Sequence, residues 1–121
     1  MKPVIEIIDE LRSTPHMPDW YSYQPEHPFK PCGIVVWGGD MIHSFRVGAE
    51  EQLMGPIPAS LFSTVLPLSK LKEHAAAGTL IRFLNQTHLV LPSMSPAIRI
   101  NMRVTGKPSQ VAVFGIQLVK D

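Results

Sequence analysis

The segment 14–31 limits the fold of this chain more than any other feature. It holds five of the chain's 12 prolines. Proline fixes one backbone dihedral and lacks an amide N–H, so neither a helix nor a central strand tolerates this density. We therefore expect an extended, partly polyproline segment that crosses the surface. Its aromatic residues either plug the core or form a recognition loop; they are Trp20, Tyr21, Tyr23 and Phe29.

The length and composition predict one domain with some apolar surface left over. A chain of 121 residues matches the usual size of a single domain, so we expect one domain over residues 1–121. Apolar residues make up 45% and charged residues 17%, against roughly 25% charged in an average globular domain. Disorder throughout is excluded, and exposed apolar patches usually mark a partner surface.

The first eleven residues carry a helical pattern. Between Val4 and Leu11 the apolar residues recur at i, i+3, i+4 and i+7, with acidic residues opposite. Pro3 suits the first turn of a helix. The pattern predicts a short N-terminal amphipathic helix, which must pack on the rest of the domain because so short a helix is marginal alone.

A β-hairpin is predicted over residues 33–47. Residues 33–37 form an unbroken apolar run, and residues 38–40 read Gly-Gly-Asp. Residues 41–47 then alternate between two faces: Met41, His43, Phe45 and Val47 on one, Ile42, Ser44 and Arg46 on the other. The unbroken run is typical of a strand covered on both faces, either in the centre of a sheet or in an oligomer contact. His43 shares a predicted face with Met41 and is either a structural or a functional histidine.

Two short helices and four strands are expected in the remainder. The helices would cover 58–66 and 69–77, where prolines and Gly78 supply the boundaries. The strands would cover 79–85, 88–91, 97–105 and 110–119 and pair as an antiparallel β-meander. The predicted fold class is α+β, with an antiparallel sheet of about five to six strands and helices on one face.

The sequence favours a cytoplasmic protein without membrane association. Acidic residues interrupt the N-terminal apolar residues, so no secretory signal is indicated. No apolar stretch approaches the length of a membrane span. Cys32 is the only cysteine, which rules out an intramolecular disulfide and agrees with a reducing compartment.

Nothing in the sequence predicts a particular reaction, and we lean against an enzyme. Phosphate-binding loops, the nucleophile elbow and the zincin helix are all missing. The five histidines include no pair with local metal-ligand spacing, so we expect neither a metal nor a cofactor. Cys32 with His27 and Asp40 is a conceivable thiolate site, but a buried thiol is the simpler interpretation.

Association with a protein is the leading expectation for function. The apolar runs 33–37 and 111–116 would exceed what one helical layer can cover, so we expect a non-catalytic adaptor module that forms a homo-oligomer or binds a protein partner. The candidate partner-binding residues are Trp20, Tyr21, Tyr23, Phe29 and Trp37.

The alternative is an accessory protein that binds single-stranded DNA or RNA. Lys and Arg are outnumbered nine to six by Asp and Glu in residues 1–78, whereas residues 79–121 hold five basic residues and one acidic residue. Strand alternation places Arg99, Asn101 and Arg103 on one polar face without an aromatic. A solvated basic strand would look the same. The candidate nucleic-acid-binding residues are Arg82, Arg99, Asn101, Arg103 and Lys107.

Overall fold

The computed structural model describes residues 4–87, 89–91 and 94–118. Its elements in chain order are β1 (Val4–Glu10), β2 (Arg12–Ser13), β3 (Trp20–Tyr23), β4 (Phe29–Trp37), β5 (Met41–Val47), β6 (Glu50–Glu51), β7 (Ile57–Pro58), the 3-10 helix η1 (Ala59–Phe62), α1 (Leu68–Ala76), α2 (Leu80–Leu84), β8 (Ile100–Val104) and β9 (Gln110–Leu118).

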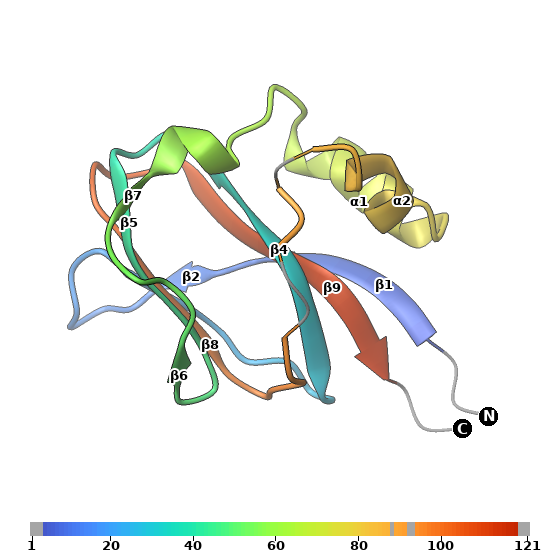
Figure 1. Cartoon of the computed structure of the whole chain (residues 1–121), viewed down its shortest axis with the longest axis horizontal. Coiled ribbons are helices and arrows are strands. Elements are labelled where there is room, and N and C mark those ends of the chain that lie inside the picture. The colour runs from blue at the N-terminus through green and yellow to red at the C-terminus, as the bar shows by residue number, and fades with distance from the viewer. Residues whose placement is uncertain (1–3, 88, 92–93, 119–121) are drawn as a thin grey trace.

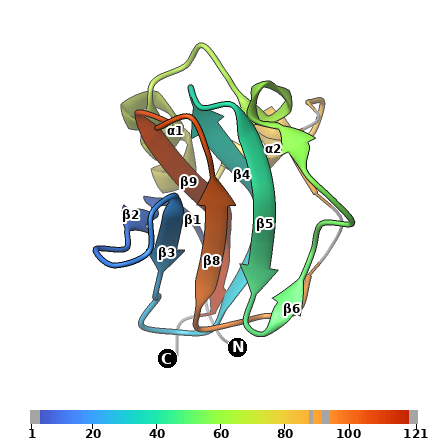
Figure 2. The ribbon, with the colours of Figure 1, turned by 90° about the vertical axis from the view of Figure 1, so that its left-hand side faces the viewer.

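The strands form two antiparallel sheets that pack face to face. Sheet A has the order β1-β9-β4, and sheet B has the order β2-β3-β8-β5-β6 with β7 also paired to β5. Figure 1 shows sheet B on the left, sheet A in the centre, and α1 and α2 on the right beyond sheet A. Figure 2 looks toward sheet B, with sheet A behind it. The broad α+β assignment is therefore confirmed, with helices covering one face of one sheet. The prediction of a single sheet of about five to six strands is wrong, because the strands divide between two sheets.

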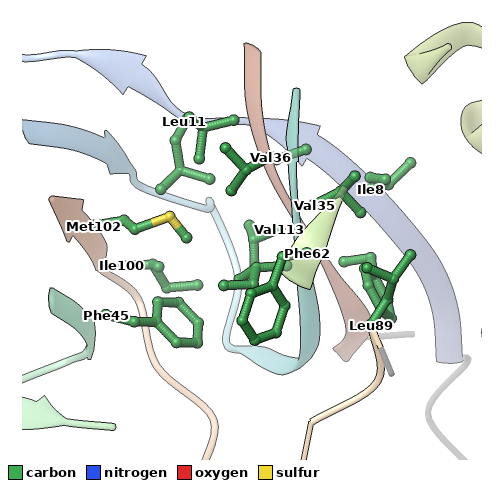
Figure 3. Packing of buried hydrophobic residues seen from close by; sticks show 14 of the residues in the cluster. Ile8, Leu11, Val35, Val36, Phe45, Phe62, Leu89, Ile100, Met102 and Val113 are labelled. Atoms are coloured by element: carbon green, nitrogen blue, oxygen red, sulfur yellow. The ribbon is translucent and has the colours of Figure 1, made fainter. Parts of the chain in front are cut away.

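The core lies between the two sheets. In β8, Ile100, Met102 and Val104 are buried and Arg103 is exposed, which confirms residues 100–104 of the half-buried strand predicted over 97–105. Ile98 precedes the strand and is exposed. Figure 3 shows Ile100 and Met102 of sheet B pointing toward Val113 of sheet A. One cluster of buried apolar side chains joins both sheets with α1 and α2. No helix of the described residues is long and apolar enough to cross a membrane.

The predicted N-terminal helix is wrong, because the described residues begin with strand β1, which pairs with β9 along its whole length. Three of the residues from Val4 to Ile8 are isoleucines, and β-branched side chains fit a pleated sheet better than a helix. Ile8 is buried and Ile5 is exposed. A short apolar run cannot be assigned to a helix or a strand from its spacing alone, because a strand inside a sheet can show the same spacing.

The predicted hairpin over 33–47 is also wrong in its pairing. Both strands exist, and Gly38 and Gly39 turn the chain with φ of 82° and 81°. However, β4 pairs with β9 in sheet A and β5 pairs with β8 in sheet B. The turn therefore carries the chain from one sheet to the other, because this lets both strands bury one face in the shared core.

The predicted meander is absent from the described residues. Residues 80–84 form α2 instead of a strand, and β8 and β9 lie in different sheets. Glu6 of β1 explains the position of this helix: its carboxylate Oε2 accepts bonds from the amides of Leu80 at 2.7 Å and Ile81 at 3.3 Å. A cap from 74 residues away leaves no local signal in the sequence. The predicted strand 88–91 contributes only the isolated bridge of Val90 to Gly33, and His88 lies outside the described residues.

The other local predictions fare unevenly. The second predicted helix is confirmed as α1, while the first shortens to the 3-10 helix η1. The last predicted strand is confirmed as β9. The segment 14–31 is not a continuous polyproline crossing, because β3 and the start of β4 lie within it. Pro31 sits in β4 beside a shift in strand register, which accommodates its missing amide.

The central residues of both apolar runs are enclosed within one copy of the chain, while Trp37 and Ile116 at their ends are partly buried. The side chains of Ile34, Val35 and Val36 are 0% exposed, and those of residues 111–114 are at most 1% exposed. One face of sheet A meets sheet B and the other meets the helical layer (Figure 1). The runs therefore need no second copy to cover them, and the argument for self-association that they supplied is lost.

Candidate functional site

The outer face of sheet B carries three arginines beside an indole ring. Trp20 of β3 lies directly opposite Arg103 of β8, and Asn101 lies opposite both Ser22 of β3 and Arg46 of β5. Directly opposed residues share one face of a sheet, and this face points away from the core. Figure 2 shows β3, β8 and β5 side by side in this layer. We call this surface the arginine face; it comprises Trp20, Ser22, Arg46, Arg99, Asn101 and Arg103.

A tight turn presents Trp20 on this surface. The Thr14 N–H donates to the Trp20 carbonyl at 2.9 Å, and the Trp20 N–H donates to the Met17 carbonyl at 3.2 Å. Asp19 takes a left-handed conformation with φ of 70°, and its carbonyl accepts a bond from Val104 at 2.8 Å. Asp tolerates this conformation better than most residues. The turn is therefore bonded both to itself and to β8, which fixes the indole at the edge of the face.

Arg46 lies over the indole of Trp20. Its guanidinium carbon is 5.5 Å from the ring centroid, a cation–π distance. Its Nε is also 3.6 Å from Oε1 of Glu51 in β6. Glu51 thereby partly neutralises Arg46 and holds it beside Trp20.

Glu51 is itself held by three hydrogen bonds. It accepts from the Ser44 hydroxyl, from the Phe45 amide at 2.8 Å and from the Leu53 amide at 3.2 Å. Partial burial raises the pKa of this carboxyl, but these bonds and the Arg46 charge lower it more, so the net pKa lies below the ordinary value. The charged form of Glu51 therefore stabilises the junction of β5 and β6.

Glu51→Gln is expected to lower the free energy of unfolding at pH 7 and to make little difference in acid. A carboxyl whose pKa is lower in the folded state contributes stability above its unfolded pKa, near 4.5, and loses it as pH falls through the folded value. Denaturant unfolding of both proteins at pH 7, 4 and 3 measures this. Glu50→Gln, the exposed neighbour in β6, is the control. A Glu51→Gln deficit that is constant across this pH range would contradict the assignment.

Arg99 and Arg103 are left with uncompensated charge. Both side chains are exposed, and no carboxylate of the described residues lies within 4.0 Å of either guanidinium. The backbone at Arg99 is fixed, because its carbonyl accepts a bond from Gly48 at 2.8 Å. The arginine face is therefore a cationic surface on a rigid backbone. Such a surface can attract an anionic partner.

A second, larger cleft lies on the other side of β3. It has a volume of about 1080 Å³ and includes Tyr21, Tyr23, Asp9 and Lys72 in its lining. Burial raises the pKa of both tyrosines, with Asp19 adding to the effect on Tyr21 and Asp9 adding to the effect on Tyr23. Both phenols are therefore neutral at physiological pH. The charges around this cleft are of both signs, so it lacks the cationic character of the arginine face.

The remaining predicted site residues lie elsewhere. Phe29 is completely buried and contacts the Tyr23 ring edge-on at a centroid distance of 5.7 Å. Trp37 is half-buried, and its indole N–H donates to the Leu66 carbonyl at 2.9 Å. Arg82 is on α2 in the helical layer, and Lys107 is in the turn after β8. The structure thus brings together Trp20, Arg99, Asn101 and Arg103 from the two predicted sets.

Among the described residues, no three His, Cys, Asp or Glu side chains form a group that could hold a metal ion. Burial raises the pKa of the half-buried Cys32 thiol, with Lys30 opposing and Glu6 adding to the effect. A raised pKa disfavours the thiolate that a nucleophile requires. The His43 Nε2 lies 3.2 Å from the Thr105 hydroxyl, and the His74 ring stacks on Phe83 at 4.4 Å. These histidines make structural contacts.

Comparison of the chain with protein-family models, with curated proteins and with solved structures found no match.

Proposed function

We propose that this protein is a non-catalytic binding module whose arginine face holds single-stranded DNA or RNA. The observation that carries the proposal is the register of β3 and β8, which places Trp20 directly opposite Arg103 and in one pocket with Arg99 and Asn101. The sequence pattern predicted a basic strand face that lacked an aromatic residue for base stacking. Trp20 is the aromatic residue that completes this face.

This combination matches the physical requirements of single-strand binding. Unpaired bases stack on aromatic rings or on guanidinium planes, and Arg side chains along the groove attract the phosphates. Trp20 and Arg46 supply both kinds of stacking surface, while Arg99 and Arg103 carry the uncompensated charge. Strands β3, β5 and β8 also hold Trp20, Arg46 and Arg103 more rigidly than a loop would, so less conformational entropy is lost on binding.

Association with a protein partner, including a second copy, is the other proposal. Its support is the set of large apolar side chains that stay exposed in one copy, of which Met54 and Val65 are the most exposed, at 107% and 100%. Light scattering over a concentration series tests it, since an oligomer would appear as a mass that rises with concentration. A monomer at every concentration removes self-association and leaves the nucleic-acid proposal intact.

Binding of a labelled twelve-nucleotide dT strand is expected to weaken steeply with salt. Trp20→Ala should weaken it by about tenfold, because stacking of one base contributes roughly 1–3 kcal/mol. Arg99→Ala and Arg103→Ala should each weaken binding and reduce the slope of log K against log salt by about 0.7, the value for one phosphate contact on a single strand. Fluorescence anisotropy titrations between 50 and 300 mM salt, on the order of the range where such binding changes, give both quantities.

Arg82→Ala is the matched control. It removes the same charge from an exposed position in α2, away from sheet B, and should leave both affinity and salt slope nearly unchanged. Thermal unfolding of each variant checks that the fold is intact. Salt-insensitive binding, or an equal loss in the Arg82 and Arg99 variants, would show that the arginine face is not the binding surface.

A further inference from the structure

A pocket beside Trp20 is lined only by uncharged and cationic residues. Its volume is about 390 Å³, within the roughly 300–1,000 Å³ range of small-molecule sites. Its charged residues are Arg46 and Arg99, and its other lining residues include Trp20, Gln24 and Asn101. No carboxylate is among these residues, so the pocket is rich in hydrogen-bond donors and offers no anionic acceptor.

This donor-rich lining distinguishes between bases. Guanine presents two adjacent acceptors, O6 and N7, which match the two-pronged guanidinium of an arginine. Adenine presents a donor, the N6 amino group, next to its N7 acceptor, and cytosine presents the N4 donor. An amino group in this pocket meets only neutral acceptors, the amide oxygens of Gln24 and Asn101 and the hydroxyl oxygens. Hydrogen bonds between neutral groups are roughly half as strong as the charge-assisted bonds of a guanidinium to guanine, so the lining favours guanine.

Arg99 is the arginine able to form such a contact. Arg46 is already engaged by the Trp20 ring at 5.5 Å and by Glu51 at 3.6 Å. Arg99 carries no carboxylate partner among the described residues, while its backbone is anchored to Gly48. Building on the proposed function, we infer that this pocket accepts one base of the bound strand and prefers guanine, with Arg99 bonded to O6 and N7 and the base stacked at Trp20 and Arg46.

The test uses dT strands of twelve nucleotides in which one central base is replaced by guanine, adenine or cytosine, titrated at a single salt concentration. The guanine strand is expected to bind about tenfold more tightly than the adenine strand, because one bidentate arginine contact distinguishes guanine from another base by about this factor. Replacement of guanine by 7-deazaguanine removes the N7 acceptor and should abolish the preference. Replacement by hypoxanthine keeps O6 and N7 and should retain it.

The ratio of guanine to adenine affinity separates this inference from the proposed function. Arg99→Lys keeps the charge but removes the fork, so the ratio should fall to near one, whereas Arg103→Lys, outside the pocket, should keep it. Equal affinity for all strands, a preference for adenine, or a ratio unaffected by Arg99→Lys or 7-deazaguanine would overturn the guanine pocket while single-strand binding stands. Failure to bind any strand would overturn both.

Discussion

Phe45→Ala is expected to lower the free energy of unfolding by about 3–5 kcal/mol, the usual cost of removing a buried phenyl ring from a core. The Phe45 side chain is 0% exposed, and Figure 3 shows it in the interior near Ile100. Since β5 pairs with both β8 and β6, the cavity would lie under the arginine face. A domain of this size is stable by only about 5–15 kcal/mol, so the loss is a large share. Urea unfolding followed by circular dichroism measures it.

Phe83→Ala is the matched control for the same change of side chain. Phe83 on α2 is 44% exposed, and its ring stacks on His74 at the surface of the protein. Removal of the Phe83 ring should therefore leave little cavity and lower the free energy of unfolding by about 1 kcal/mol or less. Similar losses in the two variants would contradict the placement of the core between sheets A and B.

The sequence predicted single elements well where one face of a strand or helix is polar. Residues 100–104 alternate strictly, which identified β8 and its exposed Arg103, and α1 has a proline before it and a glycine after it. Short apolar runs were harder: β1 and α2 were each assigned the wrong type. In both cases a distant contact decides the outcome, pairing with β9 for β1 and the Glu6 carboxylate for α2. Such contacts cannot be predicted from the local periodicity of the sequence.

Strand pairing could not be predicted, because it depends on how two sheets share one core. The turn at 38–40 is compatible with a hairpin and also with a crossing between sheets, and the residues of the turn do not distinguish the two. The same uncertainty hid part of the candidate site. Arg99, Asn101 and Arg103 follow from alternation along one strand, whereas Trp20 and Arg46 join them only through the pairing of β8 with β3 and β5. For Arg46 the one available signal was the alternation of residues 41–47, which put it on a face with Ile42 and Ser44.

Gly115→Ala is expected to destabilise the fold by about 3 kcal/mol or more, at the upper end of the cost of overpacking. Gly115 is buried in β9, opposite Pro31 of β4. A Cβ atom there would overlap the Lys30 carbonyl oxygen and lie 2.9 Å from the Phe29 ring. Neither neighbour can move easily, because β9 is paired on both sides, with β1 and with β4. The glycine therefore permits close approach of two backbones in the centre of sheet A.

Gly55→Ala tests whether this cost comes from the lack of space. No heavy atom lies within 4 Å of a Cβ built at Gly55, which is in the connection between β6 and β7. The same methyl group should therefore be neutral there, or stabilising by about 0.4–1 kcal/mol through reduced entropy of the unfolded chain. Thermal unfolding of both variants against the parent gives the comparison. If Gly115→Ala unfolded at the same temperature as Gly55→Ala, β4 and β9 could not be paired in the register that fixes the centre of sheet A.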